Sequence, residues 1–129
     1  MTKPTYRLIA CAIDDYDSSL TVKQIAALDD DERDCFEIKE GESLEGLRRD
    51  AVEWTGEWFA SVIECLVEDL PYIAIKDGVD EANKWAERAM EIVRGEPEVL
   101  AAISQLQAGE KFVGVTGAGD WVRIEEAAE

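Results

Sequence analysis

The side chains best able to do chemistry in this sequence are its carboxylates, which number 30 as Asp and Glu together. Histidine does not occur, so the usual acid–base group near neutral pH and the commonest metal ligand are missing. The cysteines Cys11, Cys35 and Cys65 lie far apart and form no CxxC pair, which favours a reducing compartment. Cys11 and Cys65 fall in apolar patterns, and we predict that both are buried. We expect no enzyme activity, no catalytic residues and no cofactor.

One acidic cluster, Asp14, Asp15 and Asp17, has the oxygen ligands that Mg²⁺ or Ca²⁺ prefers. It does not follow the EF-hand pattern, because Leu20 and Ala26 stand where that loop needs Gly and Glu. We interpret it as an Asp-rich turn and predict no metal site. A metal-dependent hydrolase that uses this cluster stays open as an alternative.

A glycine-rich segment, residues 114–120, invites comparison with a phosphate-binding loop. It has no basic residue and precedes a strand-like segment, whereas a phosphate loop opens a helix. We therefore predict a hairpin turn.

The most informative pattern is an acidic one on a long helical segment. Its members are spaced 3, 4, 7 and 4 residues apart and are Asp50, Glu53, Glu57, Glu64 and Glu68. At about 100° per residue, their directions fall within about 60° of one another and away from the apolar positions of the same helix. We call this set the acidic ridge. Like charges at i,i+4 destabilise a helix by a few tenths of a kcal/mol per pair, so folding alone gives no reason for them.

A second acidic run, Asp29, Asp30, Asp31 and Glu32, lies upstream and is called the acidic patch here. Residues 29–45 contain two basic and nine acidic residues, and 2 − 9 gives a charge of −7. Residues 79–94 mix both signs, as is typical of an ordinary solvated helix. The negative field is therefore concentrated in the N-terminal half.

Hydrophobic periodicity and the positions of Gly and Pro predict the elements that carry these residues. In chain order they are a strand at 6–13, a short helix capped by Thr21 and ending near Leu28, an acidic loop, a strand at 35–39, a long helix from Ser43 to Leu70 stopped by Pro71, a helix at 79–94, a helix from Pro97 to Gly109, and a β-hairpin at 111–125. The course of 71–78 stays open between extended and helical. We predict one α+β domain over 1–129, with helices packed on one face of a small, mainly antiparallel sheet.

The net charge is 13 − 30, or −17, at a hydrophobic content of 47%, which is enough for a packed core. So negative a chain argues against direct binding to nucleic acid or anionic membrane, since both need a positive face. The N-terminal apolar run is too short for a signal peptide, and no segment approaches a membrane span. We expect a cytoplasmic protein whose partners are basic.

In size, charge and lack of catalytic residues, the chain resembles small acidic inhibitors from phage and bacterial conflict systems. These include DNA-mimic antirestriction proteins, anti-CRISPR proteins and immunity proteins that neutralise nucleases. The interpretation is a non-enzymatic inhibitor in a bacterial host cytoplasm, whose ridge and patch bind the basic surface of a nuclease or CRISPR-type effector by charge mimicry. The alternatives are a merely solubilising acidic face, adaptation to high salt, and a small acidic adaptor or phage structural protein that makes apolar contacts.

Overall fold

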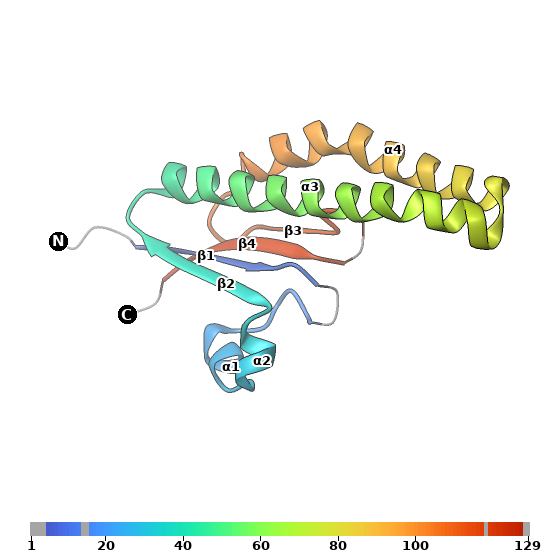
Figure 1. The fold of residues 1–129 in the computed structure, drawn as a ribbon. Helices are drawn as coiled ribbons and strands as arrows, with labels where there is room; N and C mark the ends of the chain where they lie inside the picture. The colour runs from blue at the N-terminus through green and yellow to red at the C-terminus, as the bar shows by residue number, and fades with distance from the viewer. Residues whose placement is uncertain (1–4, 14–15, 118, 128–129) are drawn as a thin grey trace.

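The computed structural model describes residues 5–13, 16–117 and 119–127. Within these residues the sheet has four strands in the order β2-β1-β4-β3, and all neighbouring strands are antiparallel (Figure 1). The strands are β1 (Tyr6–Cys11), β2 (Phe36–Gly41), β3 (Lys111–Val113) and β4 (Trp121–Glu126). The α+β class and the C-terminal hairpin are confirmed, and the first strand is shorter than predicted.

Alternation along β1 creates a buried surface on each face of the sheet. Leu8 and Ala10 belong to one core cluster, whereas Ile9 and Cys11 belong to another. Successive side chains of a strand point to opposite faces, so the uninterrupted apolar run from Leu8 to Cys11 has to be covered on both faces. The prediction that helices cover only one face is therefore incomplete.

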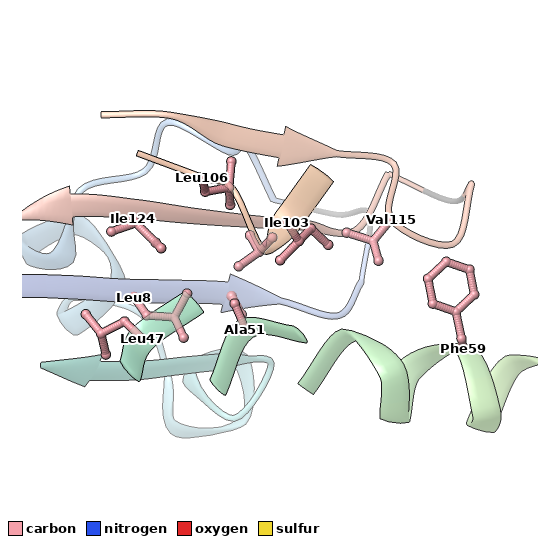
Figure 2. Close-up of a cluster of buried hydrophobic side chains, with 10 residues drawn as sticks. Leu8, Leu47, Ala51, Phe59, Ile103, Leu106, Val115 and Ile124 are labelled. Atoms are coloured by element: carbon pink, nitrogen blue, oxygen red, sulfur yellow. The ribbon is translucent and has the colours of Figure 1, made fainter. Parts of the chain in front are cut away.

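The larger core lies between the sheet and two long antiparallel helices, α3 (Leu44–Asp77) and α4 (Val79–Ile103) (Figure 1). Leu47 and Ala51 of α3 and Ile103 of α4 are buried against the sheet. Figure 2 shows Phe59 of α3 projecting toward Val115, at the far end of this cluster. The apolar pattern at the start of α3 thus packs on the sheet as the sequence predicts, and Phe59, which that pattern did not include, extends the core.

The opposite face is covered by the chain between β1 and β2, with the short helices α1 (Val22–Ala26) and α2 (Asp30–Arg33) (Figure 1). Ile25 of α1 is buried in the second cluster with Ile9 and Trp121. Thr21 caps α1 in a capping box: its Oγ1 accepts a hydrogen bond from the Gln24 backbone N–H at 3.1 Å.

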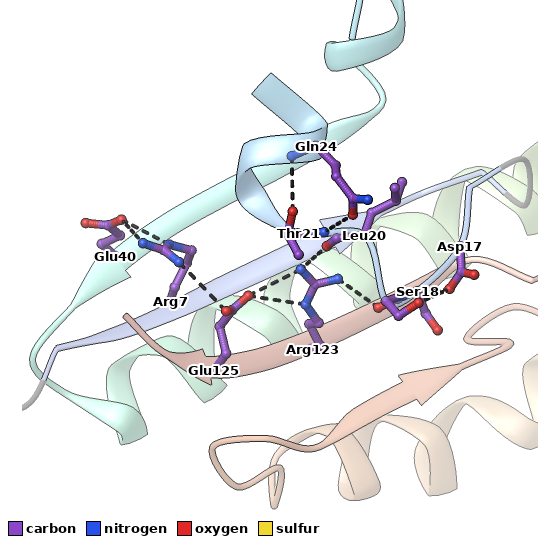
Figure 3. A network of polar contacts seen from close by, with 10 residues as sticks. Arg7, Asp17, Ser18, Leu20, Thr21, Gln24, Glu40, Arg123 and Glu125 are labelled. Carbon is purple, nitrogen blue, oxygen red and sulfur yellow. Dashed lines mark hydrogen bonds and ion pairs between the residues drawn. The ribbon is translucent and has the colours of Figure 1, made fainter. Parts of the chain in front are cut away.

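Arginine side chains tie this covering segment to the sheet (Figure 3). Arg123 of β4 donates hydrogen bonds to the backbone carbonyls of Ser18, at 2.7 Å, and Leu20. Glu125 contacts both Arg123, at 3.2 Å, and Arg7, at 3.8 Å. Positive charge in this region therefore serves internal contacts.

Helix boundaries near the prolines differ from the prediction. α3 does not stop at Pro71 but continues to Asp77, so residues 71–77 are helical. α4 runs through Pro97 to Ile103, so the two helices predicted at 79–94 and after Pro97 are one. A proline inside a helix costs about 3 kcal/mol, and here the packing of α3 against α4 offsets that local cost.

The glycine-rich segment forms the predicted turn, although Ala118 lies outside the described residues. The buried Asp120 carboxylate accepts hydrogen bonds from the Thr116 backbone N–H, at 3.0 Å, and from the Thr116 hydroxyl, at 2.8 Å. Gly114 and Gly117 have φ values of 81° and 88°, which glycine adopts without strain. Asp120 is therefore a structural residue of the hairpin.

Candidate protein-binding surface

The acidic ridge is presented by the same periodicity that buries the other side of α3. The Ser43 hydroxyl accepts a hydrogen bond from the Gly46 backbone N–H at 3.0 Å and caps the helix. Further along, Leu47, Ala51 and Phe59 are buried and fix the rotation of α3 on the sheet. The ridge falls on the opposite side, so the core determines the direction of its carboxylates.

Four of the five ridge residues are exposed, and the fifth is partly neutralised. Glu53, Glu57, Glu64 and Glu68 are exposed on α3. The Asp50 side chain is only 24% exposed, and its carboxylate is 2.7 Å from the Lys39 Nζ of β2. The helical pattern showed no base near Asp50, since this ion pair forms between two elements. The free part of the ridge is therefore Glu53 to Glu68.

Within the described part of the chain, none of these four glutamates forms an ion pair or a side-chain hydrogen bond. The sequence of α3 has no Lys or Arg between Arg49 and Lys76. By contrast, α4 pairs Lys84 with Glu81 at 3.8 Å. Four uncompensated charges thus lie along about 23 Å of one rigid helix, at 1.5 Å per residue.

The acidic patch has a different structure from the one predicted. Residues 30–33 form α2 instead of a loop, because acids in a first turn complement the helix dipole. Asp30 pairs with Arg33, and Glu32 accepts a hydrogen bond from the Tyr16 hydroxyl at 3.0 Å. Asp29 and Asp31 are exposed. Part of the patch is therefore used in local contacts.

The ridge and the patch are not brought together by the fold. α2 and α3 lie on opposite faces of the sheet (Figure 1). Between them runs the edge strand β2, on which Lys39 pairs with Asp50, and Glu40 with Arg7 at 3.0 Å. The ridge is therefore the stronger candidate surface by itself.

The other candidates for chemistry have ordinary structural roles or lie outside the described residues, as Asp14 and Asp15 do. The Asp17 carboxylate accepts hydrogen bonds from the Ser19 hydroxyl, at 2.5 Å, and from the Ser19 backbone N–H, at 2.8 Å. These bonds lower the pKa of Asp17 below its ordinary value of 3.8. Among the described residues, no three His, Cys, Asp or Glu side chains gather as a metal site.

Two features of this surface were missed from the sequence. Cys65 is exposed on α3, so the prediction that it is buried is wrong, whereas Cys11 is buried as predicted. Exposed apolar residues also cluster where α3 and α4 meet: Val67, Tyr72, Ile75, Val79, Met90 and Val93. The continuation of α3 past Pro71 to Asp77 brings Tyr72 and Ile75 onto the same helical hairpin as the other four.

Comparisons with protein-family models, curated proteins and solved structures gave no match for this chain. Among the described residues, no helix combines the length and apolar character that crossing a membrane requires. Function is therefore inferred from the surface geometry.

Proposed function

We propose that this protein is a non-enzymatic inhibitor that occupies the basic nucleic-acid-binding surface of another protein. The observation that supports this most is the exposed part of the acidic ridge, Glu53 to Glu68, which forms no ion pair among the described residues and has no base on its helix between Arg49 and Lys76. A solvated helix face normally mixes both signs, as α4 does. An uncompensated line of one sign is suited to a partner that carries the opposite sign.

The spacing of the ridge fits a phosphate backbone in part. Glu53 and Glu57, and likewise Glu64 and Glu68, are separated by about 6 Å along the helix axis. One strand of B-DNA advances 3.4 Å per phosphate, so each pair corresponds to about every second phosphate. A basic groove that binds phosphates would meet carboxylates already held in place by a packed helix, with little ordering cost.

The charge of the whole chain favours the same kind of partner. A net charge of −17 steers a basic protein toward the inhibitor and repels nucleic acid and anionic membranes. A nuclease or CRISPR-type effector meets these requirements. The biological settings consistent with it are phage anti-defence, as an anti-CRISPR or antirestriction protein, and nuclease immunity, in the cytoplasm of a bacterial host.

The test is capture of partners by the tagged protein from host lysate, washed with about 0.1 M and then about 0.5 M NaCl. A protein released by salt is purified and bound to labelled duplex DNA, and the inhibitor is titrated in. We expect displacement of the DNA by the wild-type protein, and at least tenfold weaker displacement by the variant E57K/E64K.

The matched control is E98K/E126K, which makes the same change in net charge at exposed positions away from α3. It should displace DNA nearly as well as the wild type. Displacement that is equal for both variants would remove the ridge from the mechanism. Capture of a salt-resistant partner with no basic surface would favour the adaptor function instead.

A further inference from the structure

The α3–α4 hairpin, whose far end extends past the sheet (Figure 1), carries most of the exposed large hydrophobic side chains of this acidic protein. Of the eight large hydrophobic side chains that are exposed among the described residues, six lie on it. Ile75 is 87% exposed, Val79 66% and Met90 55%. Exposed apolar residues that gather in one region mark an interaction site more often than scattered ones do.

Several of these residues belong to one continuous stripe along both helices. At intervals of three, four and seven residues, it consists of Gly56, Ala60, Ile63, Val67 and Ala74 on α3 and Val79, Ala86, Met90, Val93 and Pro97 on α4. We call this set the apolar stripe. Asn83, between Val79 and Ala86, is the one polar residue on the same line, and no charged residue interrupts it, although charged residues make up 33% of the chain.

The apolar stripe faces away from the sheet. Near the end of the hairpin that the sheet covers, Ala60 and Pro97 are exposed, and a Cβ atom at Gly56 would have no neighbour within 4 Å. Val67 and Met90 lie at similar distances from the turn at Gly78, so antiparallel packing puts them at the same level. The two halves of the stripe therefore run side by side along the hairpin as one apolar track.

Charge borders this track. On α3 the ridge residue Glu64 stands three residues before Val67 and is its neighbour on the helix surface, and Glu68 continues the ridge beyond it. On α4, Met90 lines a hollow of about 240 Å³ with Glu87, Glu91 and Arg94, a set with a net negative charge. An apolar floor with acidic borders is complementary to a helix with one apolar face and basic flanks.

We propose that the apolar stripe binds a basic amphipathic α-helix of the same partner that the ridge recognises. Apolar residues of that helix at i, i+3, i+4 and i+7 pack on the stripe, and its Lys and Arg side chains pair with Glu64 and Glu68. The identity of the partner rests on the proposed function, whereas the helical binding mode rests on the stripe. A second copy of this chain is disfavoured, because it would bring another net charge of −17 against the same acidic borders.

The test uses two synthetic peptides of equal composition and charge, each about 20 residues long and fluorescently labelled. One has Leu and Ile on one helical face and Lys and Arg on the flanks, and the other has the same residues scrambled. Fluorescence anisotropy at about 0.1 M NaCl gives the Kd of each. We expect the amphipathic peptide to bind at least tenfold more tightly, and V67S/M90S to remove most of that difference.

Circular dichroism verifies that V67S/M90S folds, and V113S is the control, since Val113 is 52% exposed on β3 and away from the stripe. Equal affinity for the two peptides, or no binding of either, would overturn the inference. So would sedimentation showing a wild-type dimer that V67S/M90S dissociates, because a second copy would then occupy the stripe. Separately, E57K/E64K should weaken the binding of both peptides. If their affinities did not change, this would count against the ridge and thus against the proposed function.

Discussion

Reversing two ridge charges should make the protein more stable while it weakens the proposed binding of a basic partner. In the wild type, Glu53 lies four residues before Glu57, and Glu64 lies four residues before Glu68, with all four side chains exposed and unpaired among the described residues. Each such pair of like charges lowers the stability of the helix by a few tenths of a kcal/mol. The variant E57K/E64K turns both repulsions into attractions.

The size of the effect follows from the exposure of these pairs. Removing about 0.3 kcal/mol of repulsion and adding about 0.3 kcal/mol of attraction at each of two pairs gives about 1 kcal/mol. The net charge falls from −17 to −17 + 4, or −13, which acts in the same direction. For a domain of 129 residues, this corresponds to an increase in Tm of about 4 °C.

The assay is thermal unfolding followed by circular dichroism at low salt and again at about 0.5 M NaCl. The gain in Tm should shrink at high salt, because exposed charges are screened. E98K/E126K is the charge-matched control and should give no such gain, since Arg94, a base, stands four residues before Glu98. A lower Tm for E57K/E64K at low salt would show that these glutamates make favourable contacts and would refute the unpaired ridge.

Three further predictions concern the fold that presents the surface. Phe59→Ala should lower the free energy of unfolding by about 3–5 kcal/mol in urea titration, because Phe59 is 2% exposed in the larger core. Gly78→Ala should lower it by about 1–3 kcal/mol, because Gly78 joins α3 to α4 at a φ of 98°; an unchanged urea midpoint would argue against this turn. Ser19→Ala should raise the pKa of Asp17 toward 3.8 in an NMR titration. Because that pKa is lowered in the folded state, the associated stability is present above pH 3.8 and is lost as the pH falls through the folded pKa.

Local patterns were sufficient to predict the α+β class and most elements. The run from Tyr6 predicts an interior strand, Thr21 predicts a helix cap, and the glycines after Val113 predict a hairpin turn. Each of these signals depends on neighbours in sequence. The ridge is of the same kind, since the periodicity that buries Leu47 also exposes Glu57.

Features that depend on distant segments could not be predicted in this way. Pro71 and Pro97 are local signals to end or begin a helix, but packing between α3 and α4 outweighs them. The ion pair between Lys39 and Asp50 forms because β2, at the edge of the sheet, brings Lys39 next to α3. The patch and the ridge are separated because the chain passes from one face of the sheet to the other between α2 and α3 (Figure 1). The apolar stripe could not be predicted in full, because it depends on α3 continuing past Pro71 and α4 continuing into Pro97.

The most direct test of the ridge as a binding surface is the salt dependence of the Kd for the captured target. We predict that log Kd rises linearly with log [NaCl] between about 0.05 M and 0.5 M for the wild type, and that E57K/E64K gives a shallower slope and a weaker complex at low salt. A Kd that does not change with salt, or a slope that E57K/E64K leaves unaltered, would contradict binding through the acidic ridge.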